Sequence, residues 1–281
     1  MLFRSIGTYR NTPLITANPT TYKGDGGIDL FYSLTPRLKA ILTVNTDFAQ
    51  TEVDDRQVNL TRFPLFFPEK RDFFLDGAGN FDFAREPTNE FNAFFTRRIG
   101  LDANGQPQKI DYGTKLIGQA GRFDIGFMQV RSGEQVGAPG EDFTVFRPKR
   151  RFMRQSYAGL IYTRRDARKS SIPVRQTIGG DFELATSRFR GNKNLQFSGF
   201  LMKTPNDAKP GDDATYGLRV NYPNDRWNAR MSYRELQKNL DPALGFMNRT
   251  GYRRWNPVVR FGPRPRSVPW IRQIEIGRAH V

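Results

Sequence analysis

Four carboxylates lie close together between residues 47 and 55 and are the first candidates for chemistry in this chain. They are Asp47, Glu52, Asp54 and Asp55. Such hard oxygen ligands can hold Ca²⁺, and two suitably separated carboxylates can cleave a glycosidic bond. Their spacing does not match an EF-hand loop, which also requires a glycine at its turn. The simpler interpretation is that they neutralise arginines inside a folded domain. We therefore predict no metal, no cofactor and no catalytic residue, and the sequence leaves enzymatic activity open while favouring its absence.

A charged run at 69–72 and an arginine pair at 97–98 form a second candidate group. These side chains could clamp a ligand. Alternatively, they pair with charges on neighbouring elements and fix a buried segment in place, because buried charges are tolerated only when they are paired. The predicted ligand-binding or constriction residues of both groups are Asp47, Glu52, Asp54, Glu69, Lys70, Arg71, Arg97 and Arg98.

The run 69–72 belongs to a phenylalanine-rich stretch, PLFFPEKRDFFLDGAGNFDF, at 64–83. Its apolar residues come in clumps that follow neither the period of a strand nor that of a helix. So many aromatic side chains would not stay exposed to water. We therefore predict an irregular segment that folds into a cavity formed by the rest of the chain. Its predicted packing residues are Phe66, Phe67, Phe73 and Phe74.

The remaining elements show the two-residue alternation of β-strands. Hairpins are predicted at 27–34/38–48, 113–121/123–131, 142–152/156–166, 175–188/195–204 and 214–236, with a last pair at 253–262/267–275. Short turns alternate with long loops, which is typical of a transmembrane β-barrel. The predicted fold class is all-β: an antiparallel up-and-down transmembrane β-barrel fragment with a long irregular insertion at about 49–112. A soluble β-sandwich would also alternate but does not require this rhythm.

The hairpin at 214–236 has one apolar and one basic face, and this predicts how the sheet is oriented. Leu218, Val220, Ala229 and Met231 share one face, and Arg219, Arg230 and Arg234 share the other. In a membrane barrel the apolar set faces outward and the basic set faces the lumen.

Composition narrows the function classes. Lys and Arg number 44 against 28 Asp and Glu, which gives a net charge of +16, and the chain has no Cys. No run approaches the ~18 apolar residues of a membrane-spanning helix. Basic clusters interleaved with aromatic residues could bind nucleic acid, but no zinc finger, helix-turn-helix or RNA-binding sheet signature is present. Nucleic acid is therefore not a predicted partner.

The sequence VNTDFAQTEVDDRQVNLTRFPLFFPEKRDFFLDGAGNF at 44–81 resembles an uncharacterised family of bacterial outer-membrane β-barrel domains. Further similar runs lie at 94–101, 110–130, 159–166 and 241–255. The resemblance implies an outer-membrane location, Gram-negative origin and an upstream periplasmic domain similar to family-nine carbohydrate-binding modules. It implies no established activity.

Both ends of the chain suggest truncation. No signal-peptide pattern occurs at the N-terminus, and 275–281 reads like the translation of a sequencing adapter. The predicted domain is a truncated barrel at 1–274, with 275–281 an artefact that includes the single His280.

The predicted function is an outer-membrane protein that passes or binds a solute, with its lumen narrowed by the phenylalanine-rich segment; a link to polysaccharide use is left open. Its predicted partners are membrane lipid and an anionic or saccharide solute. The alternatives are a carbohydrate-active enzyme that uses lumen carboxylates and a soluble basic protein that binds nucleic acid.

Overall fold

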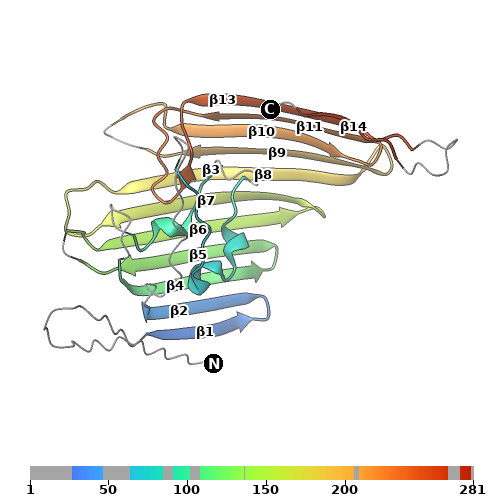
Figure 1. Ribbon diagram of the computed structural model, residues 1–281. Coiled ribbons are helices and arrows are strands. Elements are labelled where there is room, and N and C mark those ends of the chain that lie inside the picture. Colours follow the sequence, from blue (N-terminus) through green and yellow to red (C-terminus); the bar gives the residue numbers. More distant parts are fainter. Residues whose placement is uncertain are drawn as a thin grey trace, which may run out of the picture.

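The computed structural model describes residues 27–46, 64–84, 91–101, 108–135, 137–205, 209–264 and 273–279. The predicted all-β antiparallel fold is confirmed. Twelve strands form one sheet in the order β1-β2-β4-β5-β6-β7-β8-β9-β10-β11-β13-β14, and every neighbouring pair is antiparallel (Figure 1). Each strand thus pairs with the next along the sheet, in up-and-down order. The sheet is not closed, since β1 and β14 lie at its two edges.

The strand bounds agree closely with the predicted hairpins, because two-residue alternation is a strong local signal when one face is apolar. The main-sheet strands are β1 (Ile28–Thr35), β2 (Leu38–Thr46), β4 (Ile110–Ala120), β5 (Phe123–Ser132), β6 (Glu141–Phe152), β7 (Ser156–Ala167), β8 (Arg175–Phe189), β9 (Lys193–Lys203), β10 (Ala214–Pro223), β11 (Trp227–Leu236), β13 (Tyr252–Phe261) and β14 (Ile276–Ala279).

The last strand differs from its prediction. The strand expected at 267–275 lies mostly outside the described residues, and 273–275 is not a strand. The partner of β13 is instead β14, which pairs Phe261 with Ile276 and Val258 with Ala279. β14 thus lies within the segment 275–281. Without β14, β13 would be the edge of the sheet, and the exposed backbone groups of an edge strand are a template for any extended segment that reaches them.

The insertion between β2 and β4 contains only short elements. They are the helix α1 (Asp72–Leu75), the 3₁₀ turns η2 (Ala78–Phe81) and η3 (Thr96–Arg98), and the two-residue strand β3 (Phe91–Asn92), which pairs with β12 (Phe246–Met247). Figure 1 shows this part of the chain across the middle of the sheet. No helix among the described residues is long and apolar enough to cross a membrane.

The insertion packs against one face of the sheet, which we call the inner face, and the core lies between the two. Phe73, Phe74 and Phe81 of the insertion join strand residues such as Met128 and Phe143 in one buried cluster. Phe91 joins Ile161, Phe200 and others in a second cluster. The clumped phenylalanines are therefore buried against the strands, which explains why they follow no regular period.

Glycines on the inner face allow this close approach. A Cβ at Gly113 would lie 2.9 Å from the Phe73 ring, and a Cβ at Gly126 would lie 3.0 Å from the carbonyl oxygen of Asn80. Side chains at either position would push the insertion away from the sheet.

The opposite, outer face carries the apolar side chains. Leu218 is paired with Tyr233, and Val220 with Met231. Leu218, Val220 and Met231 are exposed, whereas Arg234 is buried on the inner face. The predicted division of this hairpin into an apolar outer set and a basic inner set is thus confirmed.

Candidate functional site

Cations from the strands hold the insertion on the inner face by binding its backbone carbonyls. The buried Lys115 ammonium donates to the carbonyl oxygens of Phe73 and Asp76, the latter at 2.7 Å. Lys39 forms an ion pair with the Asp76 carboxylate at 2.5 Å, and Lys149 donates to the Gly79 carbonyl at 3.3 Å. Three strands therefore meet the α1–η2 region with positive charge.

The deepest anchor is a buried ion pair between Arg147 of β6 and Asp181 of β8. Arg147 Nη1 lies 2.8 Å from Asp181 Oδ1, with side-chain exposures of 0% and 1%. Arg147 Nε donates to the Asp82 carbonyl at 2.9 Å, and the Ala84 backbone N–H donates to Asp181 Oδ2 at 3.0 Å. The Tyr157 hydroxyl donates to the same oxygen at 3.2 Å. Both partners thus bind each other and the insertion.

This ion pair crosses the strand that separates its two members. β7 lies between β6 and β8, and its residue at the crossing is Gly159, the register partner of Asp181. A Cβ at Gly159 would lie 2.4 Å from Arg147 Nη1. Only glycine leaves room for the guanidinium to pass over β7.

These contacts change part of the expected docking chemistry, although Lys39 does pair with an insertion carboxylate, that of Asp76. The sequence predicted that insertion carboxylates, including Glu69 and Asp72, would pair with basic groups of the strands. Asp72 is exposed, and Glu69 binds within the insertion itself. Backbone carbonyls perform most of the docking, because an irregular segment leaves carbonyl groups without strand or helix partners.

Glu69 and Arg71 form an ion pair within the insertion, and together with Thr96 this Glu69–Arg71 network holds two parts of the insertion together. Arg71 Nε and Nη2 each donate to the Glu69 carboxylate at 2.8 Å, and the Thr96 hydroxyl donates to it at 2.5 Å. Arg71 also donates to the carbonyl oxygens of Ile99 and Thr96 at 2.7 and 2.9 Å, and its guanidinium lies over the Phe74 ring. The Arg71 guanidinium therefore stabilises the fold of the insertion.

The Glu69–Arg71 network makes the stability of the insertion depend on pH. Burial acts to raise the pKa of Glu69, but hydrogen bonds and the positive charge from Arg71, with a hydrogen bond from Thr96, outweigh it, so the pKa lies below the usual 4.5. A lowered folded-state pKa gives stability that is complete above 4.5 and is lost as the pH falls through the folded-state value.

We therefore expect Glu69→Gln to destabilise the chain by about 1–3 kcal/mol at neutral pH, and by less at a pH well below 4.5, because a hydrogen bond to a charged group is lost. Urea unfolding at both pH values measures this difference. Asp72→Asn, at an exposed neighbouring position, is the control and should change little. A cost for Glu69→Gln that is equal at both pH values would contradict the assignment.

The other predicted site residues occupy the surface of the insertion. Arg97 is partly exposed, donates to the Pro68 carbonyl at 3.4 Å and lies over the Phe67 ring at 6.0 Å. Arg98 is exposed and donates to the Gly245 carbonyl at 3.2 Å.

The remaining predicted positions are less central. Lys70 is partly exposed, and Phe66 packs on Phe95 and Phe246 rather than on the main core. Phe73 and Phe74 are buried, as the packing prediction requires. Asp47, Glu52 and Asp54 lie outside the described residues. Within the described residues there is no group of three or more His, Asp or Glu side chains placed to hold a metal.

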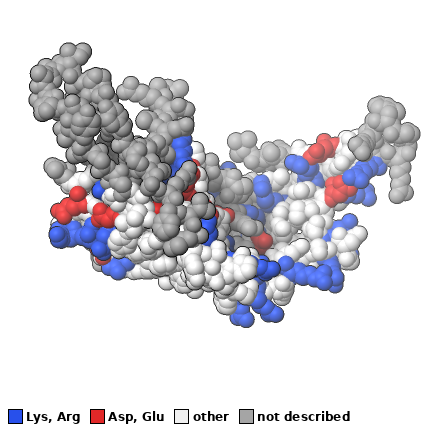
Figure 2. Space-filling model, turned by 90° about the horizontal axis from the view of Figure 1, so that it is seen from below, with Lys and Arg blue, Asp and Glu red and all other residues white. Residues whose placement is uncertain are grey.

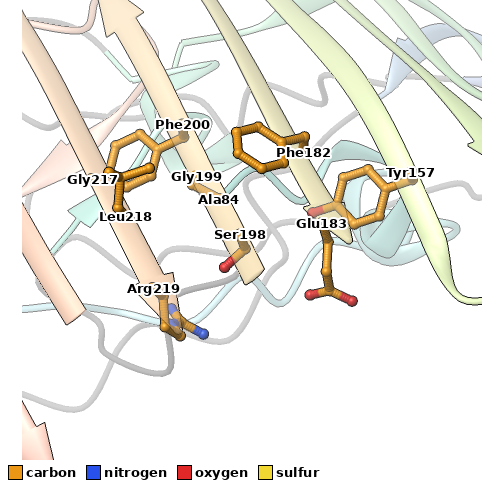
Figure 3. A pocket seen from close by; sticks show the side chains of 10 residues that line it. All are labelled: Ala84, Tyr157, Phe182, Glu183, Ser198, Gly199, Phe200, Gly217, Leu218 and Arg219. Carbon is orange, nitrogen blue, oxygen red and sulfur yellow. The ribbon is translucent and has the colours of Figure 1, made fainter. Parts of the chain in front are cut away.

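A pocket opens on the inner face beside the Arg147–Asp181 ion pair. β7, β8, β9 and β10 supply its polar side chains, and Ala84 of the insertion borders it (Figure 3). Tyr157, Glu183, Ser198 and Arg219 place a hydroxyl, a carboxylate, a second hydroxyl and a guanidinium around it, and Phe200 adds an aromatic ring. The pocket therefore offers hydrogen-bond donors and acceptors together with an apolar surface.

The sequence reasoning missed this pocket and the Arg147–Asp181 ion pair. Asp181 and Glu183 lie within the predicted strand 175–188, to which the sequence assigns no functional residue. The available signal was that both carboxylates fall on the same face of β8, where Arg147 and Arg219 of other strands also point.

A family model described as a domain of unknown function (DUF5916) matches residues 6–123. This match agrees with the resemblance to an uncharacterised family. It includes β1, β2, β4 and the phenylalanine-rich stretch. No curated protein and no solved structure matches the chain.

Proposed function

We propose that this chain forms the wall of an outer-membrane β-barrel and that its insertion narrows a lumen through which a small polar solute passes or in which it binds. The observation that carries the proposal is the chemical contrast between the two faces of the sheet. The outer face is apolar and exposed, while the inner face is charged and covered by the insertion.

The outer face has the dimensions of a lipid-facing surface. On β10, Tyr216, Leu218, Val220 and Tyr222 cover about 20 Å along the strand at ~3.3 Å per residue. A barrel's apolar band is about 25 Å tall. We call the exposed apolar side chains of this face the apolar belt. It includes Tyr32, Val44, Phe146, Leu160, Ile178, Leu184, Phe197, Leu201, Leu218, Val220, Met231, Trp255 and Val259.

Aromatic and polar side chains border this belt at both ends of the strands. Near the short turns, Trp227 packs on Phe261 and Phe189 packs on Tyr222. Near the long loops, the hydroxyls of Tyr216 and Tyr233 donate to Glu235. Aromatic residues with one polar end favour the two interfaces of a membrane.

The inner-face pocket supplies polar groups to the lumen wall, and its own volume of about 10 Å³ admits a single water-sized group, so a polar solute would lie across it rather than inside it. Its hydroxyl, carboxylate and guanidinium groups match a molecule that both donates and accepts hydrogen bonds, and the Phe200 ring gives an apolar surface to stack against. A saccharide has this chemistry. The alternative, a small anion, is supported by the exposed cation Arg98 at the insertion surface.

A larger side chain introduced beneath the insertion tests the proposal. Gly126→Val places a strand-compatible side chain against Asn80 and Phe81, whereas Gly180→Val on the outer face meets only an ordinary contact with Leu160 at 3.5 Å. We expect Gly126→Val to raise single-channel conductance in planar bilayers, because the insertion is displaced from the lumen. Gly180→Val should leave conductance unchanged.

Equal conductance of the two variants would show that the insertion does not narrow the conducting path. A chain that fails to conduct in any form, although circular dichroism shows it folded, would overturn the barrel proposal itself. Addition of a neutral oligosaccharide or of inorganic phosphate to the bath separates the two solute classes by which one reduces the current.

A further inference from the structure

The five tight hairpin turns of the sheet each carry an arginine. These turns join β1 to β2, β4 to β5, β6 to β7, β8 to β9 and β10 to β11, and all lie at the same end of the strands. Every one of these arginines is exposed. The set, which we call the arginine rim, comprises Arg37, Arg122, Arg154, Arg190 and Arg226.

The arginine rim lacks neutralising carboxylates. Among the described residues, no ion pair involves any of its five members. The two carboxylates nearest these turns are engaged elsewhere: Asp124 pairs with Arg151 at 3.3 Å, and Asp225 pairs with Arg264 at 2.8 Å. Further exposed cations, Arg150, Arg188 and Lys193, flank the same turns.

The opposite end of the sheet is different, because many of its cations are paired. The pairs there are Arg131–Asp142 at 2.7 Å, Arg165–Glu141 at 2.8 Å, Arg175–Asp241 at 2.5 Å, Lys238–Asp212 at 3.0 Å and Arg253–Glu235 at 2.8 Å. Among the described residues, the arginine rim is thus a row of five cations without ion pairs at one end of the sheet. Figure 2 shows Lys and Arg in separate groups with uncharged surface between them.

The arginine rim is continuous with the apolar belt. Arg190 lies over the Phe189 ring at 5.6 Å, Arg226 over Phe261 at 5.7 Å, and the flanking Arg150 over Phe123 at 6.0 Å. Consecutive hairpins are two strands apart, so the turn arginines recur about every 10 Å along the sheet. Guanidinium groups next to aromatic rings, as at Arg190, Arg226 and the flanking Arg150, match a membrane interface, where phosphates lie above the acyl chains.

We propose that the arginine rim binds the phosphate groups of anionic phospholipids and so sets which leaflet the turn end of the sheet contacts. This inference rests on the proposed membrane location. Guanidinium groups bind phosphate oxygens in bidentate geometry, and basic residues near an anionic surface strengthen binding additively. A nucleic acid fits less well, because the rim is a single row and its aromatic rings belong to the outward apolar belt.

Vesicle flotation tests the proposal with the folded chain. The vesicles consist either of phosphatidylcholine alone or of equal parts phosphatidylcholine and phosphatidylglycerol. We expect the unmodified chain to prefer the anionic vesicles and to lose that preference at high salt, which screens exposed charges. The test variant carries R37Q, R122Q, R154Q, R190Q and R226Q. Each lost arginine should weaken binding to anionic vesicles about fivefold, with binding to phosphatidylcholine unchanged.

The matched control removes five exposed cations from the opposite end of the sheet: K169Q, K203Q, K209Q, K238Q and R249Q. It has the same net charge as the test variant and should keep the preference for anionic vesicles. A further variant with five Arg→Lys changes at the rim should retain most of the preference. Circular dichroism confirms that each variant keeps its sheet.

Three results would overturn the proposal. The first is that the rim variant keeps its preference for anionic vesicles. The second is that the control loses as much binding to anionic vesicles as the rim variant does. Alternatively, the unmodified chain shows no vesicle preference but binds duplex DNA through the rim, which would make the surface a nucleic-acid site. Failure of the unmodified chain to bind phosphatidylcholine vesicles is a separate outcome that refutes the membrane location as well.

Discussion

Replacing Arg147 with Met should lower the free energy of unfolding by about 3–5 kcal/mol, the range for removing one partner of a buried ion pair. Asp181 is fully buried, so removal of the guanidinium leaves its carboxylate in the protein interior without a partner. The variant also loses the donor to the Asp82 carbonyl, which helps to hold the insertion. Packing alone would not account for the effect, because Met fills a large part of the space of Arg.

Urea unfolding in detergent measures this cost, with Arg150→Met as the matched control on the same strand. Arg150 is exposed, so its replacement should change stability by about 0.5 kcal/mol or less. Combining Arg147→Met with Asp181→Asn should recover part of the lost free energy of unfolding, because no buried charge then remains unpaired. Equal costs for the two single variants would show that the ion pair does not stabilise the fold.

Replacing Leu218 with Arg should cost about 2–4 kcal/mol if this position lies near the middle of a bilayer. Leu218 is 53% exposed in the centre of the apolar belt, so it meets lipid under the proposed location and water otherwise. A charged side chain at the same place in water would change stability by only about 0.5 kcal/mol. The sign and size of this effect therefore distinguish the two surroundings.

Asn228→Arg is the control for this experiment, since Asn228 belongs to the inner-face set of β11 and already neighbours arginines. Urea refolding into lipid vesicles gives both costs under the same conditions. A cost for Leu218→Arg that does not exceed that for Asn228→Arg would refute the lipid-facing assignment of the outer face.

The strands were the most predictable feature of this chain. Each carries its own two-residue alternation, which is set by residues that are neighbours in sequence. The hairpins at 27–34/38–48 and 214–236 were therefore located to within a few residues. The structure pairs β13 with 276–279, just after the strand expected at 267–275, most of which lies outside the described residues.

The inward folding of the phenylalanine-rich stretch was also accessible from sequence, because clustered aromatic side chains avoid water whatever the surrounding fold. The partners of its charged residues were not accessible. Glu69 binds Arg71 and Thr96 rather than a strand, and Lys115 binds carbonyl oxygens. Carbonyl acceptors occur at every residue and so leave no trace in the sequence.

The sequence by itself therefore determined an antiparallel sheet with one apolar and one basic face, together with a buried irregular insertion. Only the tertiary structure decided which charges meet. Arg147 and Asp181 lie on strands that are not neighbours, and their contact depends on the register of two hairpins and on a glycine at position 159 between them. Alternation is a local property of the chain, whereas this ion pair requires three strands to be aligned at once.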